Sequence, residues 1–244
     1  MIQAILFDLD DTLLGNDMDN FLPGYFSLLG EYATQFMPRE QFLTELVTCT
    51  QAMVQNDDSS LSNRDVFWRL FAQRTGLDGQ KMEAVFDQFY RNQFLQLESR
   101  TVRRPFAAKL VKLCLDKNLD VVIATNPLFP LVAIEARLAW AGLPVEAYDF
   151  ALVTAYENMH ATKPSPAYYT EILEKIECAP ENTLMVGNDW ANDIVPAHSV
   201  GIHTYWLAPA DAVTPDKTPS HRGTSLQDLY VLLAAGWQPV VSKQ

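Results

Sequence analysis

From Asp120 onward, short apolar segments alternate with segments of helical periodicity, and this alternation constrains the fold more than any other feature of the chain. The apolar segments are brief, rich in β-branched residues and bounded by turn or polar residues, which is typical of buried strands. With one further segment near the N-terminus, the predicted strands are Ala4–Asp8, Asp120–Thr125, Phe150–Thr154, Thr183–Gly187 and His203–Leu207. The predicted helices are Leu128–Ala141, Pro166–Ile176, Ala191–Val200 and Ser225–Ala235. Because parallel strands need crossover connections, the sequence predicts an α/β fold with a mostly parallel sheet covered by helices on both faces.

The segment after the first strand interrupts this alternation. It contains no recognisable strand, whereas Asp19–Leu97 shows helical periodicity up to the helix predicted at Phe106–Lys117. We interpret it as an inserted helical subdomain with hinges near Gly15–Asn20 and Glu98–Pro105. The predicted division is a Rossmann-like α/β core of residues 1–15 and 100–244 and a helical cap of residues 16–99.

Two smaller features complete the predicted organisation. Within the helical subdomain, Phe67, Leu70 and Phe71 fall on one helical face, and we expect them in its core rather than in a substrate pocket. The segment Pro209–Arg222 carries three prolines and is expected to form a surface loop.

The charge of the chain excludes several classes of partner. It has 18 Lys and Arg residues against 30 Asp and Glu residues, a net charge of −12. Such a surface repels phosphate backbones, so we expect neither a nucleic-acid partner nor an anionic membrane partner. No segment of about twenty apolar residues exists that could cross a bilayer.

The N-terminus and the cysteines indicate a cellular compartment. Met1–Leu14 lacks a basic lead and a small-residue cleavage site, so we expect no secretory signal. Cys49, Cys114 and Cys178 are odd in number and have no paired spacing, which favours reduced thiols over a disulfide framework or a zinc site. We expect a cytoplasmic protein, and its 48% hydrophobic residues are sufficient for the core of a monomer or a homodimer.

The segment Ile5–Leu14 carries the strongest chemical signal. An apolar strand ends in Asp8 and Asp10, and the carboxyl ends of strands are where open α/β sheets bind ligands. Alternate residues of an extended segment share a face, so both carboxylates are expected in one pocket. Two such carboxylates repel each other unless a cation neutralises them, and oxygen ligands favour Mg²⁺. The alternative is a solvated aspartate-rich turn.

Four further residues lie at or after the ends of predicted strands, and each has an ordinary structural explanation. Thr125 could be a strand-end hydroxyl that stabilises a turn, and Lys163 could be an exposed lysine. Asp189 and Asp193 lie four residues apart at a helix start, where aspartates cap helices and interact favourably with the helix dipole.

Together these residues resemble the four ordered signatures of the haloacid dehalogenase-like superfamily. Asp8 to Thr12 is similar to the first signature, Asp-x-Asp-x-Thr, and Thr125 matches the second. Lys163 matches the third signature, and Gly187–Asp193 matches the acidic fourth. The similarity covers roughly residues 1–15 and 100–207, on both sides of the insertion.

The resemblance implies a set of roles. Asp8 would be the nucleophile that forms an aspartyl-phosphate, and Asp10 the general acid and base. Thr125, Asn126 and Lys163 would bind the phosphoryl group. Mg²⁺ would be held by four residues, with Asp193 in a supporting position: Asp8, Asp10 through its backbone carbonyl, Asp189 and Asp193.

The resemblance also implies a substrate class. The dehalogenases that name the superfamily lack an aspartate at the position of Asp10, because a halide leaving group needs no proton. We therefore expect magnesium-dependent hydrolysis of a small phosphorylated metabolite. The inserted helices resemble a cap that closes over the site and selects the substrate, and Arg39, Arg64, Arg69 and Lys81 are candidates to reach an anionic one.

Two alternatives remain open at this level. A phosphosugar mutase would keep the same residues and transfer the phosphoryl group to a second substrate position. A non-catalytic regulatory or binding protein on this fold would be expected to have lost part of the set. The sequence does not name the substrate or the oligomeric state.

Overall fold

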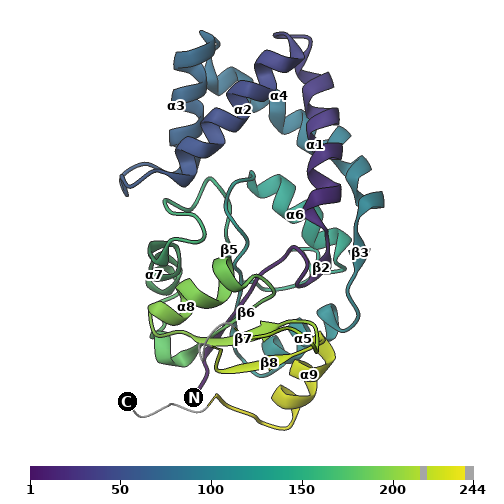
Figure 1. Cartoon of the computed structure of the whole chain (residues 1–244), viewed down its shortest axis with the longest axis vertical. Coiled ribbons are helices and arrows are strands. Elements are labelled where there is room, and N and C mark those ends of the chain that lie inside the picture. The colour runs from purple at the N-terminus through teal and green to yellow at the C-terminus, as the bar shows by residue number, and fades with distance from the viewer. Residues whose placement is uncertain (215–218, 240–244) are drawn as a thin grey trace.

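The computed structural model describes residues 1–214 and 219–239, and its centre is a sheet of six parallel strands (Figure 1). The strand order is β5-β4-β1-β6-β7-β8. The strands are β1 (Ala4–Phe7), β4 (Asp120–Ile123), β5 (Leu152–Val153), β6 (Thr183–Gly187), β7 (His203–Leu207) and β8 (His221–Gly223). The five predicted strands are confirmed, and the α/β fold with a parallel sheet is confirmed with them.

Strand β8 was not predicted. It pairs with β7 at the edge of the sheet, and its His221 and Arg222 are exposed. Three polar or small residues give no apolar run, so strand propensity provides no signal there. The prediction of a surface loop over Pro209–Arg222 is therefore wrong for its last two residues, which belong to β8. Residues 215–218 of the predicted loop lie outside the described residues.

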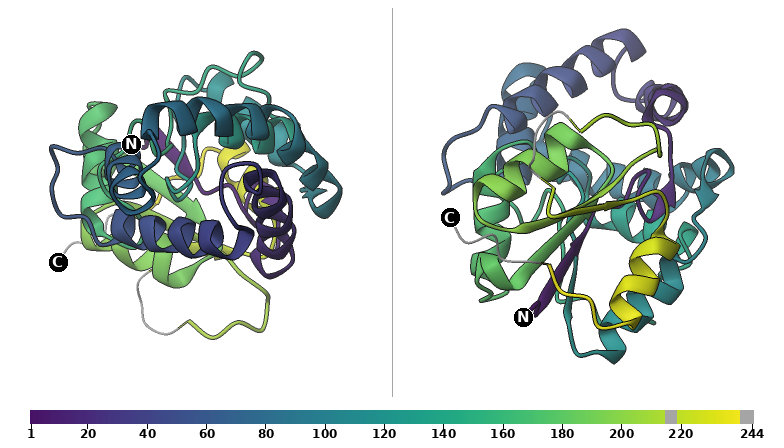
Figure 2. Two further views of the ribbon diagram at one scale, coloured as in Figure 1. Left: turned by 90° about the horizontal axis from the view of Figure 1, so that it is seen from above. Right: turned by 60° about the horizontal axis from the view of Figure 1, so that its bottom comes forward.

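Helices cover both faces of the sheet because alternate strand residues point to opposite sides. On β1, Ile5 and Phe7 face α5 (Ala107–Asp116), α6 (Leu131–Trp140) and α9 (Leu226–Ala234). Ala4 and Leu6 face the other way, toward α7 (Pro166–Lys175) and α8 (Val195–Ser199). Figure 2 shows the green helices α7 and α8 on one side of the strands and α5 and α9 on the other. All four residues are fully buried, so β1 is the centre of both cores.

The inserted segment is helical, as its periodicity predicts. It forms α1 (Met18–Ala33), α2 (Arg39–Val54), α3 (Asn63–Thr75) and α4 (Gly79–Arg91), followed by the 3₁₀ helix η1 (Gln93–Arg100). The side chains of Asp17, Ser62 and Asp78 cap α1, α3 and α4 by accepting hydrogen bonds from free N–H groups of the first turn. Figure 1 shows these helices above the end of the sheet at which the strands terminate. The division into a core and a cap remains our proposal.

The two connections to the inserted segment lie side by side. Strand β2 (Leu14–Gly15) leaves the core, and β3 (Val102–Arg103) returns to it as its antiparallel partner. Gly15 is required in this ribbon because a Cβ there would lie 2.9 Å from the carbonyl oxygen of Val102. Two-residue strands are too short to give a periodic signal, and the sequence predicted only hinges at these positions.

Two further expectations concern the whole chain. None of the helices within residues 1–214 and 219–239 is long and apolar enough to cross a membrane. Cys49, Cys114 and Cys178 are all free thiols, and the first two are buried.

Aromatic packing joins the inserted helices to the core. Phe94 of η1 is fully buried, and its ring stacks on that of Trp140 of α6 with centroids 5.4 Å apart. Its other aromatic neighbours are Phe21, Tyr25, Phe89 and Tyr90 of the inserted segment and Phe129 of the core. Phe94 is therefore part of one continuous apolar cluster that spans both parts of the chain.

We expect Phe94→Ala to reduce the free energy of unfolding by about 3–5 kcal/mol, because it removes a large side chain from a core that cannot collapse around the loss. The measurement is urea unfolding followed by circular dichroism. Leu95→Ala is the matched control on the same short helix: Leu95 is 44% exposed, and the change should stay within about 1 kcal/mol. Equal losses in both variants would contradict the role of Phe94.

Candidate active site

Three of the predicted residues meet at the carboxyl end of β1. The ammonium Nζ of Lys163 lies 2.8 Å from Oδ1 of Asp8 and 2.6 Å from Oδ1 of Asp193. Asp8 directly follows β1, and its N–H donates to the carbonyl of Val186 in the neighbouring strand β6. Lys163 comes from the loop before α7, and Asp193 from the π-helix η3 (Trp190–Ile194) after β6. Asp8 and Asp193 are 185 positions apart in the sequence, and both contact Lys163.

Burial controls the charge of this group. Asp8, Lys163 and Asp193 are 8%, 3% and 1% exposed, and two carboxylates share one ammonium. Burial raises the pKa of the Asp8 carboxyl from its ordinary value of 3.8 to about 7, although the Lys163 charge opposes the rise. Burial likewise raises the pKa of Asp193. Burial alone would lower the pKa of Lys163, but Asp193 and Asp8 raise it well above its ordinary value, so it stays charged.

Asp10 does not share these contacts. Its Oδ2 forms an ion pair with Nη1 of Arg137, and its Oδ1 accepts from Nδ2 of Asn16 at 2.6 Å. The chain turns directly after β1, where the N–H groups of Thr12 and Leu13 both donate to the carbonyl of Leu9. The extended geometry from which we predicted a common pocket for Asp8 and Asp10 therefore ends before Asp10.

Arg137 is a residue of the site that the sequence analysis missed. It lies on α6, is only 1% exposed, and its guanidinium also lies 4.7 Å from the ring centroid of Phe129. Its Nη2 is buried and has no hydrogen-bond partner among the described residues. A signal existed, because Arg137 occupies the apolar stripe of α6 together with Ile134 and Leu138. A charged residue on a buried helical face requires a partner.

Thr125 and Asn126 lie at the end of β4, beside β1. The backbone carbonyl of Thr125 accepts from the hydroxyls of Tyr168 and Thr154, both at 2.8 Å. The Thr125 hydroxyl makes no hydrogen bond to any described residue, although the side chain is only 2% exposed. The Asn126 Oδ1 accepts from the backbone N–H of Lys163 at 3.3 Å, which links the loop of Thr125 to the loop of Lys163.

Asp189 occupies a different position from the one expected. It is exposed, and its carboxylate accepts from the N–H groups of Ala191 and Asn192 as the N-cap of η3. No hydrogen bond or ion pair joins its side chain to Asp8 or Lys163 among the described residues. The helix-capping explanation therefore accounts for Asp189, whereas Asp193 lies in the buried group. The helix predicted as Ala191–Val200 is in fact η3 followed by α8.

Asn188 lies where the fourth signature meets the first. It follows β6, and its Oδ1 accepts from the hydroxyl of Thr12 at 3.1 Å. Before it, Gly187 leaves room for Asp193: a Cβ on Gly187 would lie 2.2 Å from Oδ2 of that carboxylate. The sequence comparison selected Asp189 because its side chain is acidic. In the structure, Asn188 is the residue that directly follows β6, so its amide oxygen is the side-chain oxygen at the end of that strand.

The oxygen donors at this end of β1 are mixed in type. Within the part of the chain that the structure describes, no group of three or more His, Cys, Asp or Glu side chains is arranged to hold a metal ion. Oδ2 of Asp8 accepts no hydrogen bond from a described residue, and the amide oxygen of Asn188, which follows the neighbouring strand β6, is a neutral donor. Such a set suits an ion that keeps several of its water ligands, as Mg²⁺ does.

Comparison with known proteins gives a family match over most of the chain. A family model described as haloacid dehalogenase-like hydrolase matches residues 2–201. A comparison with curated proteins gives no match.

Solved structures share the fold across the whole chain. A HAD phosphatase from Thermococcus onnurineus is 20% identical, with 98% of this chain and 100% of that chain covered and a TM-score of 0.58. A 2-haloacid dehalogenase from Pseudomonas syringae pv. Tomato DC3000 is 22% identical, with 97% and 100% covered and a TM-score of 0.62. The putative HAD-hydrolase YfnB from Bacillus subtilis, bound to magnesium, is 22% identical, with 95% and 98% covered and a TM-score of 0.55. At these identities the likeness supports the fold alone.

The raised pKa of Asp8 predicts a pH-dependent stability of the protein in the presence of a chelator. Between pH 4 and 7 the folded state retains a proton on Asp8 that the unfolded state has released. This contribution to stability is complete below about pH 4 and is lost as the pH rises through about 7. We therefore expect the free energy of unfolding of the wild type, relative to Asp8→Asn, to fall by up to about 1.4 kcal/mol per pH unit in this window. The measurement is urea unfolding of both proteins from pH 5 to 8, and parallel curves would contradict the assignment.

Proposed function

The chain belongs to the haloacid dehalogenase-like hydrolases, and from that premise we propose that it hydrolyses phosphate monoesters through a covalent intermediate on Asp8. The observation that carries the proposal is the contact of the buried Lys163 ammonium with Asp8 at 2.8 Å. One oxygen of Asp8 is held by this ammonium, and the other accepts no hydrogen bond from a described residue. A carboxylate that is oriented on one side and free on the other is suited to attack an electrophile.

In the first step, Oδ2 of Asp8 attacks phosphorus, and the bond from phosphorus to the alcohol oxygen breaks. Asp10 in its protonated form gives its proton to the leaving oxygen. Both oxygens of Asp10 have partners, so it must exchange Asn16 or Arg137 for the substrate to do this. The hydroxyl of Thr125, a residue only 2% exposed just after β4, makes no hydrogen bond to a described residue and is available to donate to a phosphoryl oxygen.

In the second step, water attacks phosphorus, and the bond from phosphorus to Oδ2 of Asp8 breaks. Asp10, now ionised, takes the proton of the water, so phosphate leaves and both carboxyl groups return to their starting forms. Throughout, Lys163 offsets the charge of Asp8 and of the phosphoryl oxygens, and Asp193 positions Lys163 from the opposite side.

We propose that Mg²⁺ completes the site. The residues that fit it are Asp8, the backbone carbonyl of Asp10 that the family resemblance implies, and the amide oxygen of Asn188 in place of Asp189. Asp193 would act through Lys163, which its Oδ1 contacts at 2.6 Å, while its Oδ2 accepts from the N–H of Asp189. A bound Mg²⁺ would supply positive charge that stabilises the phosphoryl oxygens.

The presence of Asp10 favours a phosphate ester over a haloacid as substrate. An alkoxide leaving group needs a proton, whereas a halide does not. The chain maintains Asp10 with a buried arginine, and burying that charge is costly. This arrangement is expected where the carboxylate at position 10 has a function.

We expect the wild type to release phosphate from p-nitrophenyl phosphate and from a panel of metabolite phosphomonoesters only with Mg²⁺. Asp8→Asn should lower kcat by at least about a thousandfold, because the nucleophile is lost. Phosphate release is measured with and without chelator, and 2-chloropropanoate is included as a haloacid substrate. Chloride release without any phosphate release would assign the chain to the dehalogenases instead.

A second prediction separates the two aspartates of the fourth signature. Asp193→Asn should lower kcat/KM by about 10–100-fold, because it removes the carboxylate that positions Lys163. Asp189→Ser retains an N-cap oxygen and should stay within about twofold of the wild type, since the residue is an exposed cap. Both variants are assayed on p-nitrophenyl phosphate at saturating Mg²⁺. A larger loss for Asp189→Ser than for Asp193→Asn would restore Asp189 as a metal ligand.

A further inference from the structure

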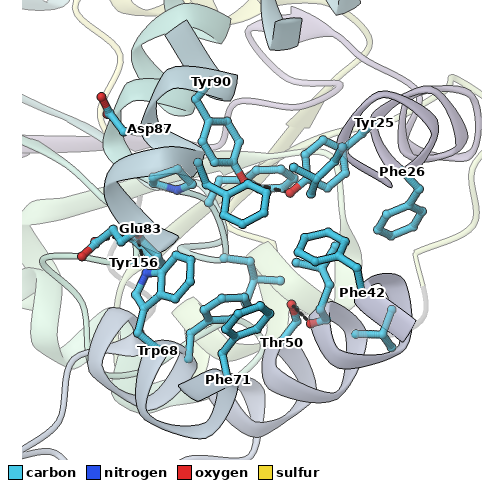
Figure 3. A pocket seen from close by; sticks show the side chains of 18 of the residues that line it. Tyr25, Phe26, Phe42, Thr50, Trp68, Phe71, Glu83, Asp87, Tyr90 and Tyr156 are labelled. Carbon is cyan, nitrogen blue, oxygen red and sulfur yellow. Dashed lines mark hydrogen bonds between the residues drawn. The ribbon is translucent and has the colours of Figure 1, made fainter. Parts of the chain in front are cut away.

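A cavity of about 340 Å³ lies between the inserted helices and two loops of the core. Helices α1 to α4 all contribute to its wall, and Leu128–Pro130 and Tyr156–Glu157 close it from the core side. Figure 3 shows the rings of Phe42, Trp68 and Phe71 directed into this space. Its volume is within the range of roughly 300–1,000 Å³ that small-molecule sites occupy.

The wall of the cavity is aromatic and contains no cation. Among its lining residues there is no Lys, Arg or His, and the charged ones are Glu83, Asp87 and Glu157. Arg64 pairs with Glu83 at 2.5 Å but is not itself a lining residue. None of the cations considered from the sequence, including Arg39 and Lys81, lines the cavity. An anionic ligand would therefore meet carboxylates and no positive charge among the lining residues.

The lining corrects one expectation from the sequence. Phe67 and Phe71 are buried, as a core prediction requires, but both also line the cavity. Helical periodicity identifies the buried face of a helix and does not reveal whether that face meets side chains or a space.

The cavity is adjacent to the proposed phosphate site. Its core wall at Leu128–Pro130 begins three residues after Thr125, and the ring of Phe129 contacts the guanidinium of Arg137, the partner of Asp10. The start of α3 is also tied to this region. The N–H of Arg64 donates to the carbonyl of Tyr156 at 2.8 Å, and Nδ2 of Asn63 reaches the carbonyl of Pro127 at 3.4 Å.

We propose that this cavity binds the alcohol part of the substrate, and that the substrate is a phosphate monoester of an aromatic alcohol that carries no further negative charge. The inference rests on the proposed function and names its substrate class. Aromatic rings in the wall offer edge and face contacts to an aromatic ligand. The carboxylates Glu83, Asp87 and Glu157 disfavour a second anionic group on the substrate.

The first test compares three esters with the same alkyl attachment to phosphate: 3-phenylpropyl phosphate, propyl phosphate and 3-(phosphonooxy)propanoate. We expect kcat/KM at least about tenfold higher for the phenyl ester than for propyl phosphate, and lower still for the carboxylate ester. Equal values for the first two, or a preference for the carboxylate ester, would overturn the inference. Magnesium-dependent hydrolysis without a phenyl preference would leave the proposed function standing, whereas no hydrolysis of any ester would overturn both.

The second test fills the cavity. Thr50 and Thr48 lie on α2, are both half-buried, and each donates to the carbonyl four residues earlier at 2.8 Å, but only Thr50 lines the cavity. We expect Thr50→Trp to lower the ratio of kcat/KM for the phenyl ester to that for propyl phosphate by about tenfold, and Thr48→Trp to leave it unchanged. The ratio is measured on one preparation, so it does not depend on the fraction folded. An unchanged ratio in Thr50→Trp would overturn the assignment of the cavity.

Discussion

The contact of Lys163 with Asp8 and Asp193 is the interaction on which the rest of the site depends. Two carboxylates cannot be buried beside each other without a positive charge, and once Asp8 is ionised a single ammonium between them leaves one negative charge in excess. Each partner comes from a different element, so the ion pairs form only when β1, β6 and the loop before α7 are assembled. The fold is therefore a precondition of the charge arrangement, and the remaining excess charge is the physical reason to expect a cation.

Much of the fold could be predicted because its strands are continuous apolar runs. The parallel sheet buries both faces of β1, and Ala4–Phe7 has the composition this requires. Prediction failed where a strand is too short or too polar to have a pattern, as at β8 and in the ribbon of β2 and β3. The ordered motifs selected Asp8 and Lys163, which the structure brings into contact, but spacing could not decide between Asp189 and its neighbours. That choice depends on where the backbone turns after Gly187, and the spacing of residues in the sequence does not reveal this turn.

Arg137 illustrates a different limit of sequence reasoning. Periodicity assigned its helix correctly, and the arginine was overlooked because a helix tolerates one charge without losing its pattern. Its partner Asp10 is 127 residues away in the sequence. The turn after β1 brings them together. Asp10 thus pairs with Arg137 while Asp8 pairs with Lys163, so the two carboxylates have different partners and can have separate chemical roles.

The cavity under the inserted helices differs in charge from the site at the end of β1. A phosphate monoester has one strongly anionic end, and in the function that we propose the buried ammonium at the end of β1 serves that end alone. None of the residues that line the aromatic cavity beside it is a cation, and Arg64, which pairs with the lining residue Glu83, is already neutralised. A ligand bound across both regions would be sorted by polarity, with the phosphoryl group on the core and the apolar group under the helices. Phe129 forms part of the cavity wall and also contacts Arg137, the partner of Asp10. A ligand in the cavity would therefore contact a ring that itself packs against Arg137.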